Sequence, residues 1–77
     1  MVEETIDLRD VPPQKRHGLV MDTFEALDSE GTLTLVNDHE PRPLFYQMQA
    51  EVDTFDAEGY SVEERGTEEF VATLPKL

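Results

Sequence analysis

The fold is decided by the stretch Thr32-Leu33-Thr34-Leu35-Val36-Asn37-Asp38-His39-Glu40-Pro41-Arg42-Pro43-Leu44. Its first five residues alternate polar and apolar side chains and are rich in β-branched types, which predicts a half-buried strand. The polar run from Asn37 to Glu40 ends that strand. Pro41 and Pro43 are compatible with a helix only in its first turn, where a missing amide has no partner within the helix. The stretch therefore predicts a strand, a junction and the start of a helix.

Apolar residues at helical spacing follow this junction, and others occur before it along the chain. A stripe of apolar residues predicts a second helix that fades before Gly59, and it is made of Leu44, Met48, Val52 and Phe55. Upstream, the alternating segment 5–9 predicts a first strand, and Pro13 suits the first turn of a helix that ends near Asp28. Gly18 lies inside this first helical pattern, where it either permits close approach of a ligand or backbone, or marks a later helix start.

Two further strands are predicted at the end of the chain. Segments 60–65 and 69–74 flank Gly66-Thr67 and form a hairpin, whose predicted inward residues are Tyr60, Val62, Phe70, Ala72 and Leu74. The order is βαβαββ, and right-handed crossovers place both helices on one face of the sheet. We therefore predict an α+β fold, a two-layer α/β sandwich with a four-stranded mixed sheet, in one domain spanning residues 1–77 with an ordered core of about 5–74.

Composition excludes several classes of function. The 77 residues contain no cysteine and two histidines, so thiol nucleophiles, persulfides and cysteine-based metal clusters are ruled out. No apolar stretch approaches the roughly 18 residues that a membrane helix needs, and the charged first ten residues do not resemble an export signal. We expect a soluble cytoplasmic protein.

The net charge also limits which functions are possible. Eighteen acidic residues against six Lys and Arg give a formal charge of −12, which disfavours binding to nucleic acid or to anionic lipid. Two explanations remain open: a halophilic surface adapted to molar salt, or an acidic interaction face. The acids are dispersed rather than gathered in blocks, which favours salt adaptation.

The few cations gather at the two strand-to-helix junctions. Segments 9–18 and 37–46 contain four of the six Lys and Arg residues and both histidines. Helix N-termini at such junctions attract negative charge, so we predict a site for a small anionic ligand or a partner protein. The candidate binding residues are Arg16, His17, Asp38, His39, Arg42 and Tyr46.

Three alternatives stay open for these residues. Neighbouring acids could neutralise every cation in surface ion pairs, Asp38 could cap the second helix, and Tyr46 could be an ordinary boundary tyrosine. His17 and His39 are weak candidates for metal ligands or for an acid and a base in a histidine-dependent site. No evident nucleophile lies in either junction, so binding is favoured over catalysis, and the sequence names no cofactor.

The strings Leu8-Arg9-Asp10-Val11-Pro12-Pro13, Arg16-His17 and Leu35 to Gln47 (LVNDHEPRPLFYQ) support a family resemblance. Over about residues 5–74 the chain resembles the 2249 family of domains of unknown function, which is related to the TusA/SirA sulfur-carrier fold. The resemblance implies the same βαβαββ sandwich. Sulfur carriers hold a persulfide on the cysteine of a C-P-x-P motif, whereas this chain has Pro12-Pro13-Gln14-Lys15 in that region, so the carrier mechanism does not transfer.

For function, the resemblance indicates only the kind of metabolism to which the domain is linked. Domains of this family occur fused to or near hemerythrin-like and iron-sulfur-assembly domains, which suggests a link to redox, sulfur or metal metabolism. Together with the residues at the junctions, this predicts a small acidic, non-catalytic binding or adaptor domain. The alternative is a histidine-dependent metal-binding or enzymatic site at the same junctions.

Overall fold

The structure, a computed structural model, describes residues 3–39 and 42–77, so the predicted role of Pro41 lies outside the described residues. Its elements follow the predicted order, with two short 3-10 helices added. They are β1 (Glu3–Asp7), η1 (Leu8–Asp10), α1 (Pro13–Ala26), β2 (Thr32–Asn37), α2 (Arg42–Glu51), η2 (Ala57–Gly59), β3 (Ser61–Gly66) and β4 (Glu69–Pro75). No helix within these described ranges is both long enough and apolar enough to cross a membrane.

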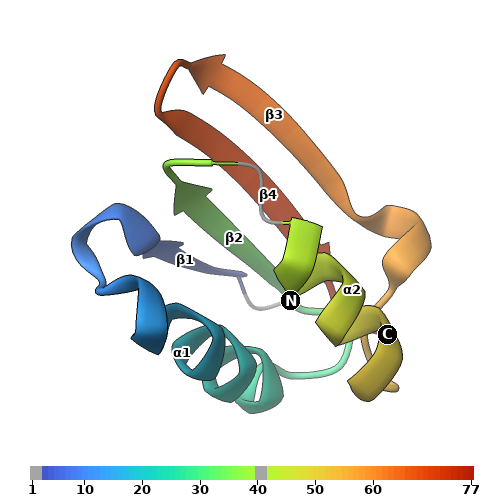
Figure 1. Cartoon of the computed structure of the whole chain (residues 1–77). Coiled ribbons are helices and arrows are strands. Elements are labelled where there is room, and N and C mark those ends of the chain that lie inside the picture. The colour runs from blue at the N-terminus through green and yellow to red at the C-terminus, as the bar shows by residue number, and fades with distance from the viewer. Residues whose placement is uncertain (1–2, 40–41) are drawn as a thin grey trace.

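The four strands form one open mixed sheet in the order β1-β2-β4-β3. β1 runs parallel to β2, with Ile6 opposite Leu35, and β4 runs antiparallel to both β2 and β3. Both helices lie on the same side of this sheet (Figure 1). The prediction of an α+β fold with a four-stranded mixed sheet and two helices is confirmed.

The core lies between the sheet and the two helices. Leu33 and Leu35 of β2 are fully buried, whereas Thr34 between them is half-buried, because successive side chains point to opposite faces of a strand. The other buried apolar residues come from every layer of the fold: Leu8, Val20, Phe24, Leu27, Leu44, Met48, Phe55, Ala72 and Leu74. The helix-covered face of the sheet is therefore the apolar one.

The second helix is shorter than its apolar stripe predicted. α2 ends at Glu51, and Phe55 instead lies in an isolated bridge opposite Lys76, with 6% of its surface exposed. There the backbone amide of Asp56 donates to the carbonyl of Pro75 at 3.0 Å. Pairing with the end of β4 thus replaces further helical hydrogen bonds, while Phe55 still reaches the core.

The first strand and the first helix also end early. β1 stops at Asp7, whose carboxylate accepts a hydrogen bond from the amide of Arg9 at 3.0 Å and so caps η1. α1 ends at Ala26 rather than near Asp28. Because the chain coils at η1, Leu8 is turned into the core instead of continuing the strand.

The hairpin has the predicted strands, with small shifts. Its turn follows Gly66, and the pairing is irregular between Glu64 and Gly66. Tyr60 lies just before β3 and is half-buried, as are Val62 and Phe70. Of the predicted inward residues, only Ala72 and Leu74, on the inner strand β4, are fully buried.

Candidate functional site

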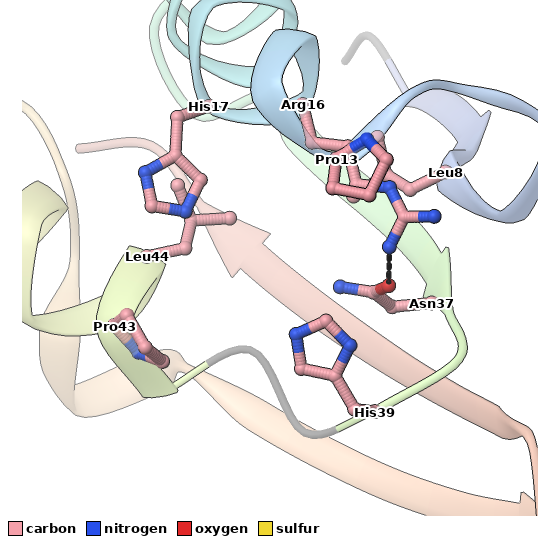
Figure 2. Close-up of a pocket in the computed structure, with 8 residues that line it drawn as sticks. All are labelled: Leu8, Pro13, Arg16, His17, Asn37, His39, Pro43 and Leu44. Atoms are coloured by element: carbon pink, nitrogen blue, oxygen red, sulfur yellow. Dashed lines mark hydrogen bonds between the residues drawn. The ribbon is translucent and has the colours of Figure 1, made fainter.

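The two strand-to-helix junctions meet in space because β1 and β2 are parallel neighbours. The N-terminal ends of α1 and α2 consequently lie side by side, next to the end of β2. Between them is a cavity of about 140 Å³ (Figure 2). It is lined by Leu8, Pro13, Arg16, His17, Asn37, His39, Pro43 and Leu44.

Arg16 is the most buried charge of this cavity. Only 7% of the residue is exposed, and its Nε donates to the carbonyl of Val11 at 2.8 Å. Its Nη1 donates to Asn37 Oδ1 at 3.0 Å and to Asp38 Oδ1 at 3.1 Å, and its Nη2 lies 3.4 Å from Asp38 Oδ2. Protein oxygens therefore accept hydrogen bonds from most of the N–H groups of this guanidinium. Arg16 holds the cavity wall in place and has few donors left for a ligand.

Asp38 links Arg16 to His39. Its carboxylate is 3.1 Å from the Arg16 guanidinium and 2.7 Å from His39 Nδ1. The hydrogen bonds from Arg16 and then from His39 lower the pKa of Asp38 to about 2. Asp38 therefore stays ionised well below neutral pH and offsets the positive charge of Arg16.

Asn37 supplies the buried polar group that faces the cavity. It is 4% exposed, and its Oδ1 accepts hydrogen bonds from Arg16 and from the amide of Asp38 at 2.8 Å. These two donors fix which end of the side-chain amide is oxygen. The Nδ2 group points into the cavity (Figure 2), and no hydrogen bond joins it to any residue that the structure describes.

Sequence reasoning treated Asn37 only as the polar end of a strand. A signal for its role was nevertheless present, because Asn37 follows Leu33 and Leu35 at two-residue spacing and so belongs to the buried face of β2. A polar residue on that face needs partners, and here it finds them on one side only.

Both imidazoles border the cavity with one nitrogen anchored outside it. His17 Nδ1 lies 2.8 Å from Gln47 Oε1, and His39 Nδ1 lies 2.7 Å from Asp38 Oδ1. Because the Asp38 carboxylate only accepts, His39 Nδ1 carries the hydrogen, and Nε2 of both rings lies on the cavity side (Figure 2). His17 and His39 therefore border the same cavity.

The remaining candidate residues lie outside the cavity wall. Tyr46 is 59% exposed and packs edge-on against Phe45, with ring centroids 5.6 Å apart. Arg42 begins α2 and is exposed, and it is not among the residues that line the cavity. Within residues 3–39 and 42–77, no group of three or more His, Asp or Glu side chains is placed to hold a metal ion.

Residues 5–76 match a known family of proteins. The matched region includes both junctions, both helices and the whole cavity wall. The chain belongs to the family described as uncharacterized conserved protein, DUF2249. No curated protein and no solved structure matches this DUF2249 chain.

The cavity of the DUF2249 domain can attract negative charge. The first turns of α1 and α2 contain no acidic residue within the described chain, although acids are usually favoured there and this chain has 18 of them. Pro12, at the N-cap of α1, makes no side-chain capping hydrogen bond. Among the described residues that line the cavity there is no serine, threonine, cysteine or carboxylate that could act as a nucleophile.

Proposed function

We propose that this chain is a non-catalytic binding domain that holds a small anionic ligand in the cavity between the N-terminal ends of α1 and α2. The observation that carries the proposal is the side-chain amide of Asn37. Only 4% of Asn37 is exposed, and its Nδ2 is directed into the cavity (Figure 2). A donor that opens only to the cavity and has no partner among the described residues favours an acceptor atom there, and an anion supplies the strongest acceptors.

Electrostatics support an anion at this position. Two helix N-termini, with their partial positive charge, converge on the cavity, and the described residues of their first turns include no acid. The Nε2 groups of His17 and His39 donate hydrogen bonds when the rings are protonated. The limited volume of about 140 Å³ supports a small molecule over a segment of a partner protein.

The architecture supports a relationship to the TusA/SirA-like sulfur carriers. In those proteins the functional cysteine lies at the start of the first helix, and here Pro13 in the same region lines the cavity. Because the chain contains no cysteine, a persulfide cannot form. We therefore propose a retained site with different chemistry, in a cytoplasmic domain linked to redox, sulfur or metal metabolism.

Nuclear magnetic resonance titration tests the proposal directly. Isotope-labelled protein would be titrated with acetate, phosphate and sulfate at constant ionic strength, while the signals of the Asn37 side-chain amide and of both imidazoles are followed. We expect saturable shifts at these groups for at least one anion. The shifts should weaken in the H17A/H39A double variant and persist in Q49A, a change at an exposed position of α2. An absence of saturable shifts for every anion would overturn the proposal.

A histidine-dependent metal or acid-base site is the rival function. Each Nδ1 is held by an oxygen, the arrangement that orients imidazoles at many metal sites. Two imidazoles alone are fewer protein ligands than a structural metal site uses. Elemental analysis of protein purified without chelator separates the two functions, since stoichiometric metal that is lost in H17A and in H39A would favour the rival.

A further inference from the structure

The wall of the cavity is divided between polar and apolar residues. The polar groups come from Arg16, His17, Asn37 and His39, and the other four lining residues are Leu8, Pro13, Pro43 and Leu44. In Figure 2 the Asn37 amide faces across the cavity towards Leu44. A ligand that fills this space therefore meets Asn37 and His39 on one side and the hydrocarbon of Pro43 and Leu44 on the other, with His17 beside Leu44 (Figure 2).

The number of available donors limits the charge of the ligand. Arg16 is engaged by Val11, Asn37 and Asp38, and the lowered pKa of Asp38 keeps a negative charge beside it. α1 begins with Pro13 and α2 has Pro43 as its second residue, so each helix lacks one of the N-terminal amides that cradle phosphate in other proteins. A tetrahedral dianion would leave oxygens unpaired against this wall, at a cost in free energy.

The volume limits the size of the ligand. An engineered protein cavity of about 150 Å³ holds benzene, which has about six non-hydrogen atoms. The cavity here is about 140 Å³. It therefore has room for an acid with a short hydrocarbon chain, whereas most of a nucleotide would lie outside it.

Building on the proposed function, we propose that the ligand is a short-chain monocarboxylate. Its carboxylate accepts hydrogen bonds from Asn37 Nδ2 and from Nε2 of His39 when that ring is protonated, and its hydrocarbon chain lies against Pro43 and Leu44. A free small acid is favoured over an acidic side chain of another protein. The chain's net charge of −12 repels an acidic protein surface far more than a single small anion.

The length of the acid provides the test, and it needs no variant. Dissociation constants of the intact protein would be measured at constant ionic strength for formate, acetate, propionate, butyrate and hexanoate, and for phosphate and sulfate. From acetate to butyrate we expect the affinity to rise about fourfold with each methylene group, because each is buried against the apolar wall. Hexanoate should bind more weakly than butyrate because it exceeds the cavity.

Two variants locate the binding. N37D replaces the donor by an acceptor of nearly the same shape and should weaken butyrate binding by about tenfold or more. Q49D adds the same charge at an exposed position of α2 and should change the affinity less than about twofold. L44A enlarges the apolar end and should move the preferred acid to a longer chain.

The outcomes separate this inference from the proposed function. Equal affinity across the acids, or tighter binding of phosphate or sulfate than of butyrate, would overturn the monocarboxylate and leave the anion site in place. If none of the anions binds, both proposals are wrong. If N37D or L44A does not fold, the length series on the unmodified protein still decides the question.

Discussion

At the scale of single residues, Arg16 joins parts of the chain that are distant in sequence. Its guanidinium contacts Val11 after η1, Asn37 at the end of β2 and the adjacent Asp38. Burying a charge is costly unless its donors are matched by acceptors, and here oxygens from two junctions provide them. The shape of the cavity therefore depends on Arg16 even though few of its donors are open to a ligand.

R16M should destabilise the protein. The substitution keeps much of the side-chain volume but leaves the carbonyl of Val11 and Asn37 Oδ1 without a charged donor, which costs about 2 kcal/mol or more in the free energy of unfolding. Chemical denaturation monitored by circular dichroism measures this loss. R9M is the matched control, because the Arg9–Asp7 pair is exposed and its removal should have little effect. Equal stability of R16M and the unmodified protein would contradict this role.

D38N should destabilise the protein in a pH-dependent way. Arg16 and His39 lower the pKa of Asp38 from 3.8 to about 2, so the ionised carboxylate favours the folded state. A lowered folded-state pKa gives stability that is present above the unfolded value, near 3.8, and that is lost as the pH falls towards about 2.

The melting temperature of D38N should accordingly be lower than that of the unmodified protein at pH 7. The difference should shrink as the pH is lowered from 4 towards 2, a range bounded by the two pKa values. D22N, at an exposed position of α1, controls for the loss of one negative charge. A difference that is independent of pH would show that the carboxylate charge is not the cause.

At the scale of elements, Gly18 is a weak point of α1. The helix begins at Pro13, so Gly18 does not mark a later start, and a Cβ built at this position meets nothing within 4 Å. The later helix start is therefore wrong, and no neighbouring backbone of the described chain approaches Gly18 closely. Glycine inside a helix instead costs conformational entropy in folding.

G18A should stabilise the protein by about 1 kcal/mol, since alanine restricts the unfolded chain and fits the helix without contact. Thermal or chemical denaturation measures the gain. G59A is a suitable contrast, because a Cβ there would lie 2.8 Å from Pro75 Cγ, and it should not stabilise. A loss of stability in G18A would mean that the backbone at Gly18 needs a freedom which the structure does not show.

The ends of the elements show what could be predicted from sequence. The periodicity of apolar residues predicted the four strands and two helices, because strands repeat every two residues and helices about every 3.6, and both repeats are visible within a short segment of sequence. It did not give the end of α2, where Phe55 keeps its place in the core while the backbone pairs with the last strand. It also missed the C-terminal end of α1, where Lys76 Nζ donates to the carbonyls of Phe24 and Leu27 at 3.1 and 2.7 Å.

The candidate site was predictable to a similar extent. The concentration of cations and histidines at two junctions indicated the end of the sheet at which the cavity lies, and the parallel pairing of β1 and β2 brings Arg16, His17 and His39 to that cavity. The acceptors that Arg16 finds on Asn37 and Asp38, and the resulting orientation of the Asn37 amide, depend on contacts across 21 and 22 residues. Local patterns do not contain such contacts, so they emerge only from the folded chain.

At the scale of the whole molecule, the charge of −12 predicts a dependence on salt. Dispersed acids repel one another at low ionic strength, and near 1 M salt the screening length falls to about 3 Å. The melting temperature should therefore rise from low to molar KCl. Sucrose at matched osmolality is the control for exclusion from the protein surface. A flat or falling melting temperature would contradict a salt-adapted surface.

The strand order has a consequence for how the chain folds. β4 is the last strand in sequence but lies inside the sheet, between β2 and β3. In a nascent polypeptide that has been synthesised only through β3, the strands β2 and β3 lack the strand that lies between them. Each of them keeps an unpaired edge until β4 is made. Completion of the sheet must therefore wait for β4 to pair with β2, which is distant along the chain, and this favours slow, cooperative folding over assembly strand by strand during translation.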